Sequence, residues 1–228
     1  CVALIIFSIL FWALYFQMFF SATLFIDRLI DHNLFGVTIP TQVFFGMESL
    51  GIIVFGFLLG LLWKRLELRH KDLSHPMKFA ISFWFLALTF LAFIASAHFI
   101  SDTQLGSAVW VLIAMLFFSL GELCLSPIGL SAITMLAPPK IVGLMMGTWL
   151  ISLGIGGKLA SLLAHLAAVN PAQGMGAASI KHIYTHTFWI FIIIAIVVSF
   201  IALALTPLIK QLTVDGNLSK DQHEQANA

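Results

Sequence analysis

The chain has 228 residues, of which 61% are hydrophobic and 9% charged, and its formal net charge is +1. A soluble domain carries about 25% charged residues, so the composition excludes an ordinary soluble domain and indicates a membrane protein. The net charge gives no indication of nucleic-acid binding, and two cysteines make no disulfide framework.

Six apolar stretches are long enough to cross a bilayer, which takes ~20 mainly apolar residues. They cover approximately residues 2–26, 43–63, 79–99, 108–136, 141–168 and 187–208. The sequence therefore predicts an all-α membrane protein, with a six-helix bundle over residues 1–209 and a polar cytoplasmic tail over residues 210–228. Because the sequence starts with Cys1 instead of an initiator Met and runs directly into a hydrophobic segment, we expect a fragment of a longer protein.

Basic residues concentrate on one side of the predicted membrane, and such residues favour the cytoplasmic side. That side has eight of them, against Arg28 and Lys181 on the other side. The bias predicts that both ends of the chain are cytoplasmic. The eight residues are Lys64, Arg65, Arg69, Lys71, Lys78, Lys140, Lys210 and Lys220.

Aromatic side chains dominate the first span. Trp12, Tyr15 and Phe19 recur at helical spacing and share a face, with Gln17 among them. One interpretation is helix packing with an interfacial anchor. The other is that Gln17 and the aromatic rings line a ligand cavity.

Glu48 lies near the start of the second span. At the outer interface a carboxylate costs little, because water reaches it. Alternatively, Glu48 faces the same cavity as a second carboxylate, Glu122.

Glu122 lies inside the fourth span, which is otherwise uncharged from Trp110 to Leu136. A charged group at bilayer depth costs roughly 2.5–3.5 kcal/mol even on lenient insertion scales, so it usually has a partner or a function. Ser126 is four residues on and shares its face, and Pro127 removes a backbone hydrogen bond there. The pattern predicts a polar binding site, with a paired or protonated structural glutamate as the alternative.

The fifth span combines small residues with two candidate site residues. Gly143 and Gly147 form a small-xxx-small pair that favours close helix packing. Trp149 and Ser152 share a face, and Lys158 is a second charge at depth. Lys158 either extends to the interface or forms an ion pair with an acidic residue.

No catalytic or metal-binding pattern appears along the sequence. His182 and His186 are four residues apart, but no carboxylate stands near them. Neither a nucleophile elbow nor a phosphate loop is present, so we predict neither an enzyme nor a metal site, and no cofactor.

Four segments resemble one known family. They are F-W-A-L-Y-F-Q at residues 11–17, H-K-D-L-S-H-P-M-K-F at 70–79, G-E-L-C-L-S-P-I-G-L at 121–130 and M-M-G-T-W-L at 145–150. Their order and spacing resemble the C-terminal half of the proton-dependent oligopeptide transporters, a branch of the major facilitator superfamily, and the bacterial di- and tripeptide permeases in particular.

The resemblance implies a fold and a partner. The six spans would be helices seven to twelve of a twelve-helix transporter, arranged as two three-helix inverted repeats. The missing N-terminal six-helix half would be the partner within the lipid bilayer, and protons would be the coupling ion.

The resemblance also implies roles for individual residues. Glu122 matches the glutamate that holds the amino terminus of the peptide. Trp149 and Ser152 match the region that lines the side-chain pocket, and Trp12 and Gln17 match the cavity face of helix seven. Ser126 shares the face of Glu122 and joins the expected substrate-binding set.

Three residues bear on gating and on departures from the family pattern. Asp27 stands where the family often has an acidic residue near the outer gate. Glu48 stands where an asparagine usually contacts the peptide backbone, and Lys158 is unusual for helix eleven. A new acid and a new base suggest altered selectivity or an ion pair across the cavity.

These observations predict proton-coupled symport of di- and tripeptides into the cytoplasm, by alternating access across the inner membrane. Two alternatives stay open. One is transport of another small polar or zwitterionic solute by the same fold, and the other is a truncated membrane protein that transports nothing.

Overall fold

The computed structural model describes residues 2–34, 36–71, 73–101, 103–168 and 176–226, with the side chains of residues 2, 136 and 208–226 outside the description. The predicted tail residues Lys210 and Lys220 are among these, so only their backbone is described.

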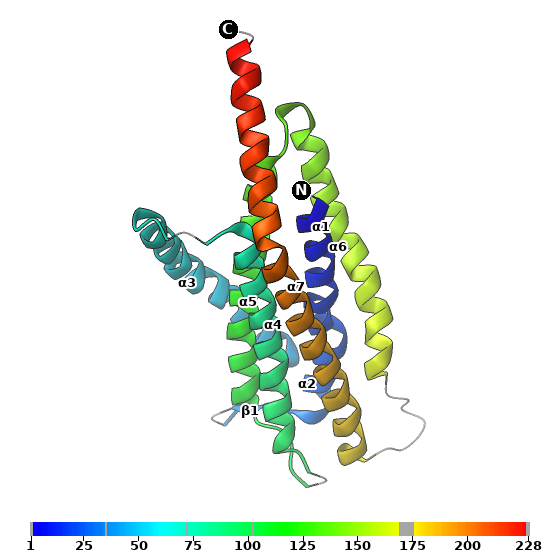
Figure 1. The fold of residues 1–228 in the computed structure, drawn as a ribbon. Helices are drawn as coiled ribbons and strands as arrows, with labels where there is room; N and C mark the ends of the chain where they lie inside the picture. The colour runs from blue at the N-terminus through cyan, green and yellow to red at the C-terminus, as the bar shows by residue number, and fades with distance from the viewer. Residues whose placement is uncertain (1, 35, 72, 102, 169–175, 227–228) are drawn as a thin grey trace.

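Long helices cross the molecule one after another, and short connections join them (Figure 1). Six helical segments are long and apolar enough to span a membrane, as the sequence predicts. Two short antiparallel strands of two residues each lie between the first two segments, a feature that hydropathy did not predict. The elements are α1 (Val2–Tyr15), η1 (Met18–Ala22), α2 (Thr23–Leu29), β1 (Asn33–Leu34), β2 (Val37–Thr38), α3 (Thr41–Leu68), α4 (His75–His98), α5 (Ala108–Leu136), η2 (Pro139–Ile141), α6 (Val142–Ala164), η3 (His165–Ala167) and α7 (Ala177–Ala226).

The first span contains a π-helical turn, η1, between α1 and α2. The Thr23 hydroxyl donates to the carbonyl of Met18 at 2.9 Å, five residues back. The same carbonyl accepts from the Thr23 backbone N–H, the i→i+5 bond typical of a π turn. Such turns are common at functional sites, and this one follows the aromatic segment that ends at Phe16.

Helix packing follows an internal symmetry. The principal pairs are α1 with α6, α3 with α5, and α4 with α7, together with the sequential pair α4 and α5. In terms of the six spans, these pairs join span one to five, two to four and three to six. If spans one, two and three change places with spans four, five and six, the first pair becomes the second, and the third pair stays the same. The structure thus has the pairing of two three-helix repeats, as predicted.

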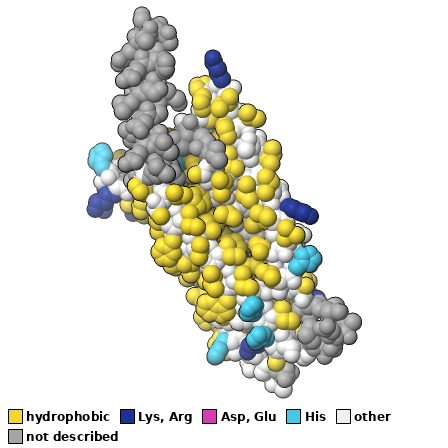
Figure 2. All heavy atoms as spheres, turned by 45° about the vertical axis from the view of Figure 1, so that its right-hand side comes forward, with side chains coloured by type: hydrophobic (Ala, Val, Ile, Leu, Met, Phe, Trp, Pro, Cys, Tyr) yellow, Lys and Arg dark blue, Asp and Glu magenta, His cyan; other side chains and the backbone are white. Residues whose placement is uncertain are grey.

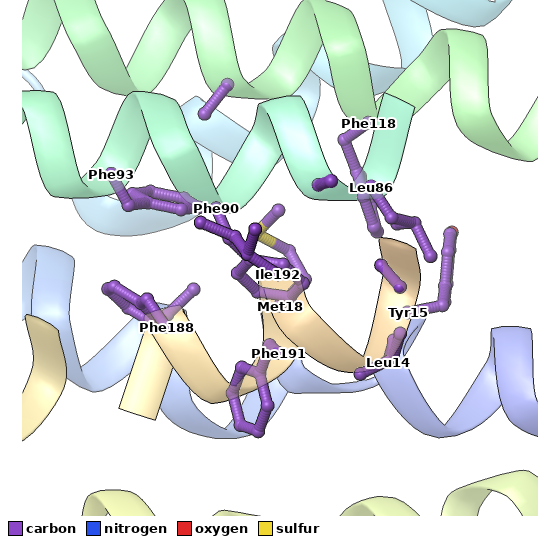
Figure 3. Packing of buried hydrophobic residues seen from close by; sticks show 14 of the residues in the cluster. Leu14, Tyr15, Met18, Leu86, Phe90, Phe93, Phe118, Phe188, Phe191 and Ile192 are labelled. Atoms are coloured by element: carbon purple, nitrogen blue, oxygen red, sulfur yellow. The ribbon is translucent and has the colours of Figure 1, made fainter. Parts of the chain in front are cut away.

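Phenylalanine side chains fill the interface between α2, α4 and α7. Phe188 on α7 lies 5.3–5.8 Å, between ring centroids, from three neighbours: Phe25 on α2, and Phe90 and Phe93 on α4. Figure 3 shows Phe90, Phe93 and Phe188 meeting between two helices. Aromatic pairs in these geometries pack closely and hold their helices at a fixed separation.

Two helices are poorly covered. In an apolar stretch of 18 residues, 11% is buried in the α3 span and 22% in the α6 span, against 61% in α4. Figure 1 shows α3 leaning away from the other helices. Figure 2 shows a largely hydrophobic surface on one face of the molecule, with histidine and basic side chains mainly toward its margins. The molecule therefore has a packed side around α4 and α7 and an open side at α3 and α6.

Candidate functional site

A groove of about 530 Å³ lies where α1, α3, α5 and α6 approach one another. Its lining is mostly apolar and includes one carboxyl group, Glu122. Glu122 and Ser126 are partly buried. The lining residues are Trp12, Ile52, Glu122, Leu123, Ser126, Pro127, Leu130, Trp149, Leu150 and Leu153. The structure thus brings together four predicted site residues from three helices: Trp12, Glu122, Ser126 and Trp149.

Glycines set the wall of the groove. A Cβ atom at Gly129 would collide with the Trp149 ring, so the ring lies directly against α5 only because residue 129 has no side chain. On its other side, Trp149 stacks on Phe79 with 14° between the ring planes. Gly156 plays the same part for Trp12, because a Cβ there would meet the α1 backbone.

The Tyr15 hydroxyl connects two carboxyl groups at one side of this groove. Its oxygen lies 2.8 Å from Glu48 Oε1 and 3.1 Å from Glu122 Oε2. The two carboxyl oxygens are therefore no farther apart than the sum of these distances. Glu48 is 7% exposed, so it lies inside the bundle rather than at an interface with water. Glu48 therefore lies beside Glu122, as one of the two expectations had it, but it is not among the residues that line the groove.

Close packing of α3 on α5 brings Glu48 to this place. Ser119 Oγ on α5 donates to the Glu48 carbonyl at 3.0 Å and lies 2.9 Å from the carbonyl of Met115. A Cβ atom on Gly51 would overlap Ser119, so a larger residue there would push the two helices apart. The register of this crossing puts Glu48 of α3 opposite Glu122 of α5.

Gln17 and Ser152 lie behind the groove and are not among its lining residues. Gln17 is fully buried, and its amide nitrogen donates to the carbonyl of Ala160 on α6 at 2.8 Å. Its amide oxygen accepts from Ser21 at 2.7 Å. Ser152 Oγ lies 2.8 Å from Ser8 Oγ. Both residues tie the first span to α6.

Asp27 and Lys158 occupy separate places. Asp27 accepts from Thr41 at 3.4 Å, and the Thr41 hydroxyl lies 3.0 Å from His32 Nε2, which links the end of α2 to the start of α3. Lys158 is exposed on α6 and is not among the groove-lining residues. The structure therefore does not bring Lys158 together with Glu48 and Glu122.

Tyr15 is the site residue that sequence reasoning left out of its binding set. Its spacing of three from Trp12 shows that the two share a face, but only tertiary packing shows that its hydroxyl reaches α3 and α5. Trp12 adds a second unforeseen feature: its indole Nε1 is buried and has no acceptor within the described part of the chain.

Family comparison agrees with this architecture. The model of the POT family, designated PTR2, matches residues 1–183. The chain belongs to the POT family. Membership agrees with the resemblance drawn from the four sequence segments. The relatives described next are permeases and peptide transporters, not enzymes.

Curated relatives of this POT chain are bacterial. Dipeptide and tripeptide permease A of Chromobacterium violaceum is 28% identical over 216 residues, which are 95% of this chain and 43% of that protein. Peptide transporter YePEPT of Yersinia enterocolitica is 33% identical over 165 residues, covering 72% of this chain and 32% of the relative. The chain thus spans less than half the length of the relatives it matches.

Solved structures show the same fold. A mutant of the peptide transporter POT in complex with sulfate superposes with a TM-score of 0.79 at 26% identity, covering 92% of this chain and 40% of that one. Tetrameric PepTSo2 gives a TM-score of 0.76 at 27% identity, with 93% and 43% covered. The fold is therefore that of one six-helix half of a major facilitator superfamily transporter, and the chain is an integral inner-membrane protein.

Proposed function

We propose that this chain forms the C-terminal half of a proton-coupled symporter that carries di- and tripeptides into the cytoplasm by alternating access. The observation that carries the proposal is the groove that Glu122 lines together with Trp12 and Trp149. A carboxylate in a largely apolar groove binds an ammonium group through charge-assisted hydrogen bonds, and the rings accept variable apolar side chains. Permeases and peptide transporters among the relatives support the cargo.

The proposed roles follow the distance of each residue from the groove. Glu122 pairs with the amino terminus of the peptide, and Ser126, one helical turn along, contacts the backbone of the substrate. Trp12 and Trp149 form the side-chain pocket. Gln17 and Ser152 hold α1 and α6 at the spacing that this pocket needs.

The open side of the bundle supports an N-terminal six-helix half as the partner. Exposed apolar residues on α3 include Ile53 and Phe57, and on α6 Leu144 and Leu150. The relatives contain more than twice the matched length, which is enough chain to cover this side. We assign α3 and α6 to the contact between halves, and the outer surface of α7 to lipid.

The proposed gate and topology use the remaining sites. Asp27, linked through Thr41 to α3, lies at the outer end of the groove-forming helices and responds when α3 tilts against α2. Lys158, exposed on α6, forms an ion pair with an acidic residue of the other half. Both ends of the chain, with the polar segment from residue 210 onward, face the cytoplasm.

The test is peptide uptake by the complete protein in proteoliposomes with an inward proton gradient. Glu122→Gln keeps the size of the side chain and removes its charge. Losing one partner of a buried charge pair costs about 2–5 kcal/mol, so dipeptide uptake should fall at least tenfold. The control is Glu67→Gln, the same change at an exposed position on α3. Unchanged uptake and proton dependence in Glu122→Gln would reject the assignment.

Glu48 gives a specific reason to test a second cargo. It puts a second carboxyl group beside Glu122, which changes the charge that the groove presents to a substrate. Competition by di- and tripeptides, free amino acids and organic anions against a labelled dipeptide separates the two cargoes. Stronger competition by amino acids than by peptides would favour a small zwitterionic solute.

A further inference from the structure

Tyr15 has a single hydroxyl hydrogen and two carboxyl neighbours. Its oxygen lies 2.8 Å from Glu48 Oε1 and 3.1 Å from Glu122 Oε2. An ionised carboxylate only accepts hydrogen bonds, whereas a protonated carboxyl group also donates one. Both contacts are full hydrogen bonds only when one carboxyl group carries a proton and donates it to the phenol oxygen. The geometry therefore indicates one proton shared by two acids.

Burial supports the same proton count. Tyr15 is 8% exposed and Glu48 is 7% exposed. Two ionised carboxylates this close, in a medium of low dielectric constant, repel each other strongly. A proton on one of them removes that repulsion without any counter-ion.

Two basic groups lie on the helices that surround the acids. On α4, Lys78 has its ammonium group 4.9 Å from the Trp63 ring, and Trp63 is about four helical turns from Glu48 along α3. Lys158 is exposed on α6, about two and a half turns from Trp149. The Lys78 charge also acts on the Cys124 thiol, two residues from Glu122 on α5.

Two further elements carry titratable groups. Asp27 and His32 meet Thr41, about two helical turns from Glu48 along α3. Cys124 is a buried free thiol on α5, two residues from Glu122 and therefore on a different face of that helix. Tyr15 bonds to both acids, and Glu48 also interacts directly with Glu122.

The two acids differ in their access to the groove. Glu122 is among the groove-lining residues, whereas Glu48 is not. We infer that Glu48 holds a proton and donates it to the Tyr15 oxygen, while Tyr15 donates to an ionised Glu122 that faces the groove. Glu48 is thus the residue that carries the proton, and Tyr15 positions it.

This arrangement holds a proton and an organic ammonium group at the same time, a step that rests on the proposed function. The ammonium group pairs with Glu122 while the proton stays on Glu48, so two acids, one proton and one cation sum to zero charge. When the ammonium group leaves, the Glu48 proton passes to the Tyr15 oxygen as the phenol hydrogen passes to Glu122. No other bond forms or breaks, and the exchange is reversible.

Infrared difference spectroscopy of the complete protein in lipid tests the proton directly. Glu48→Gln should remove one carbonyl band of a protonated carboxyl group, and Glu67→Gln should remove none. Glu48→Asp should keep a band, which shows that its loss in Glu48→Gln is not misfolding. Tyr15→Phe should shift the band, because the phenol acceptor is gone. An unchanged band in Glu48→Gln overturns the inference.

Addition of dialanine separates this inference from the transport proposal. The Glu48 band should persist with dialanine bound, and N-acetyl-dialanine, which has no ammonium group, should bind at least tenfold more weakly. Loss of the band on binding would mean that the ammonium group displaces the proton, and would overturn simultaneous binding. If the protein keeps the band but neither binds nor transports dialanine, the proton on Glu48 is supported and the proposed function is rejected.

Discussion

The phenylalanine core around α4 and α7 differs sharply from the groove between α3 and α6. In the core, Phe188 lies within aromatic contact of Phe25, Phe90 and Phe93, and no water-accessible surface remains on any of them beyond 1%. On the groove side, Phe57 on α3 is 69% exposed, and the polar triad of Tyr15, Glu48 and Glu122 lies at the margin.

The difference separates support from function. Close aromatic packing has one arrangement, because any shift opens voids or overlaps. The groove side is held by few contacts, mainly the Gly51–Ser119 crossing and the α1–α6 hydrogen bonds. For the proposed alternating access, α3 and α6 are therefore the helices expected to move, and α4 and α7 the fixed core.

Phe188→Ala should have the largest effect on stability. Removing a buried phenylalanine ring leaves a cavity and costs about 3 kcal/mol or more. Denaturant unfolding in detergent measures the loss. Phe57→Ala removes the same ring from the exposed face of α3, and its cost in this chain should be well below 1 kcal/mol. Equal losses would show that the two sides do not differ in packing.

Gly51→Ala should have the next largest effect. The new Cβ overlaps Ser119 and separates α3 from α5, and overpacking of this kind costs about 1–3 kcal/mol. Glu48 should then lose its contact with Tyr15, so the infrared band of the protonated carboxyl should shift with the loss of stability.

Gly60→Ala is the matched control on the same helix, because a Cβ at Gly60 meets nothing within 4 Å. It should leave the band in place and leave stability unchanged or slightly higher, since alanine is the better helix former. A band shift in Gly60→Ala as large as in Gly51→Ala would remove the helix crossing as the cause.

The spans and the Glu122 environment could be predicted from sequence because both depend on local composition. Twenty apolar residues form a spanning helix whatever their neighbours, and the i, i+4 relation of Glu122 to Ser126 is fixed by helix geometry. The pairing of Glu48 with Tyr15 depends on which helices cross and at which residue. That information lies in contacts such as Gly51 against Ser119, which no single segment contains.

Gln17 and Ser152 show the opposite limit. Both are polar, lie in apolar spans and match a family region, and sequence reasoning therefore put them in the binding set. In the structure their polar atoms bond to neighbouring helices. Sequence does not distinguish a polar group that faces a ligand from one that faces another helix, because both occur at the same helical periodicity.

Tyr15→Phe tests the polar triad on the groove side with a smaller change in the side chain. It removes one hydroxyl and keeps the ring, which stacks on Phe118 at 4.4 Å between centroids. Loss of a hydrogen bond of this kind costs about 1–2 kcal/mol, so dialanine affinity should fall roughly fivefold to thirtyfold. Tyr184→Phe, at the Arg28 contact, is the control and should leave affinity unchanged. Equal affinities in wild type and Tyr15→Phe would exclude Tyr15 from the site.

Ser152→Ala should have the smallest effect, and its pattern decides what this residue does. The Ser8–Ser152 hydrogen bond joins α1 to α6, and such bonds between membrane helices contribute on average about 0.6 kcal/mol. If Ser152 only joins helices, Ser8→Ala should cost the same and the double variant should cost no more than either single one, because each removes the same bond. Dialanine affinity should change little in all three. If Ser152 touches the substrate instead, Ser152→Ala alone should weaken dialanine binding while Ser8→Ala should not. Ser152 would then be a substrate-binding residue, as the sequence predicts.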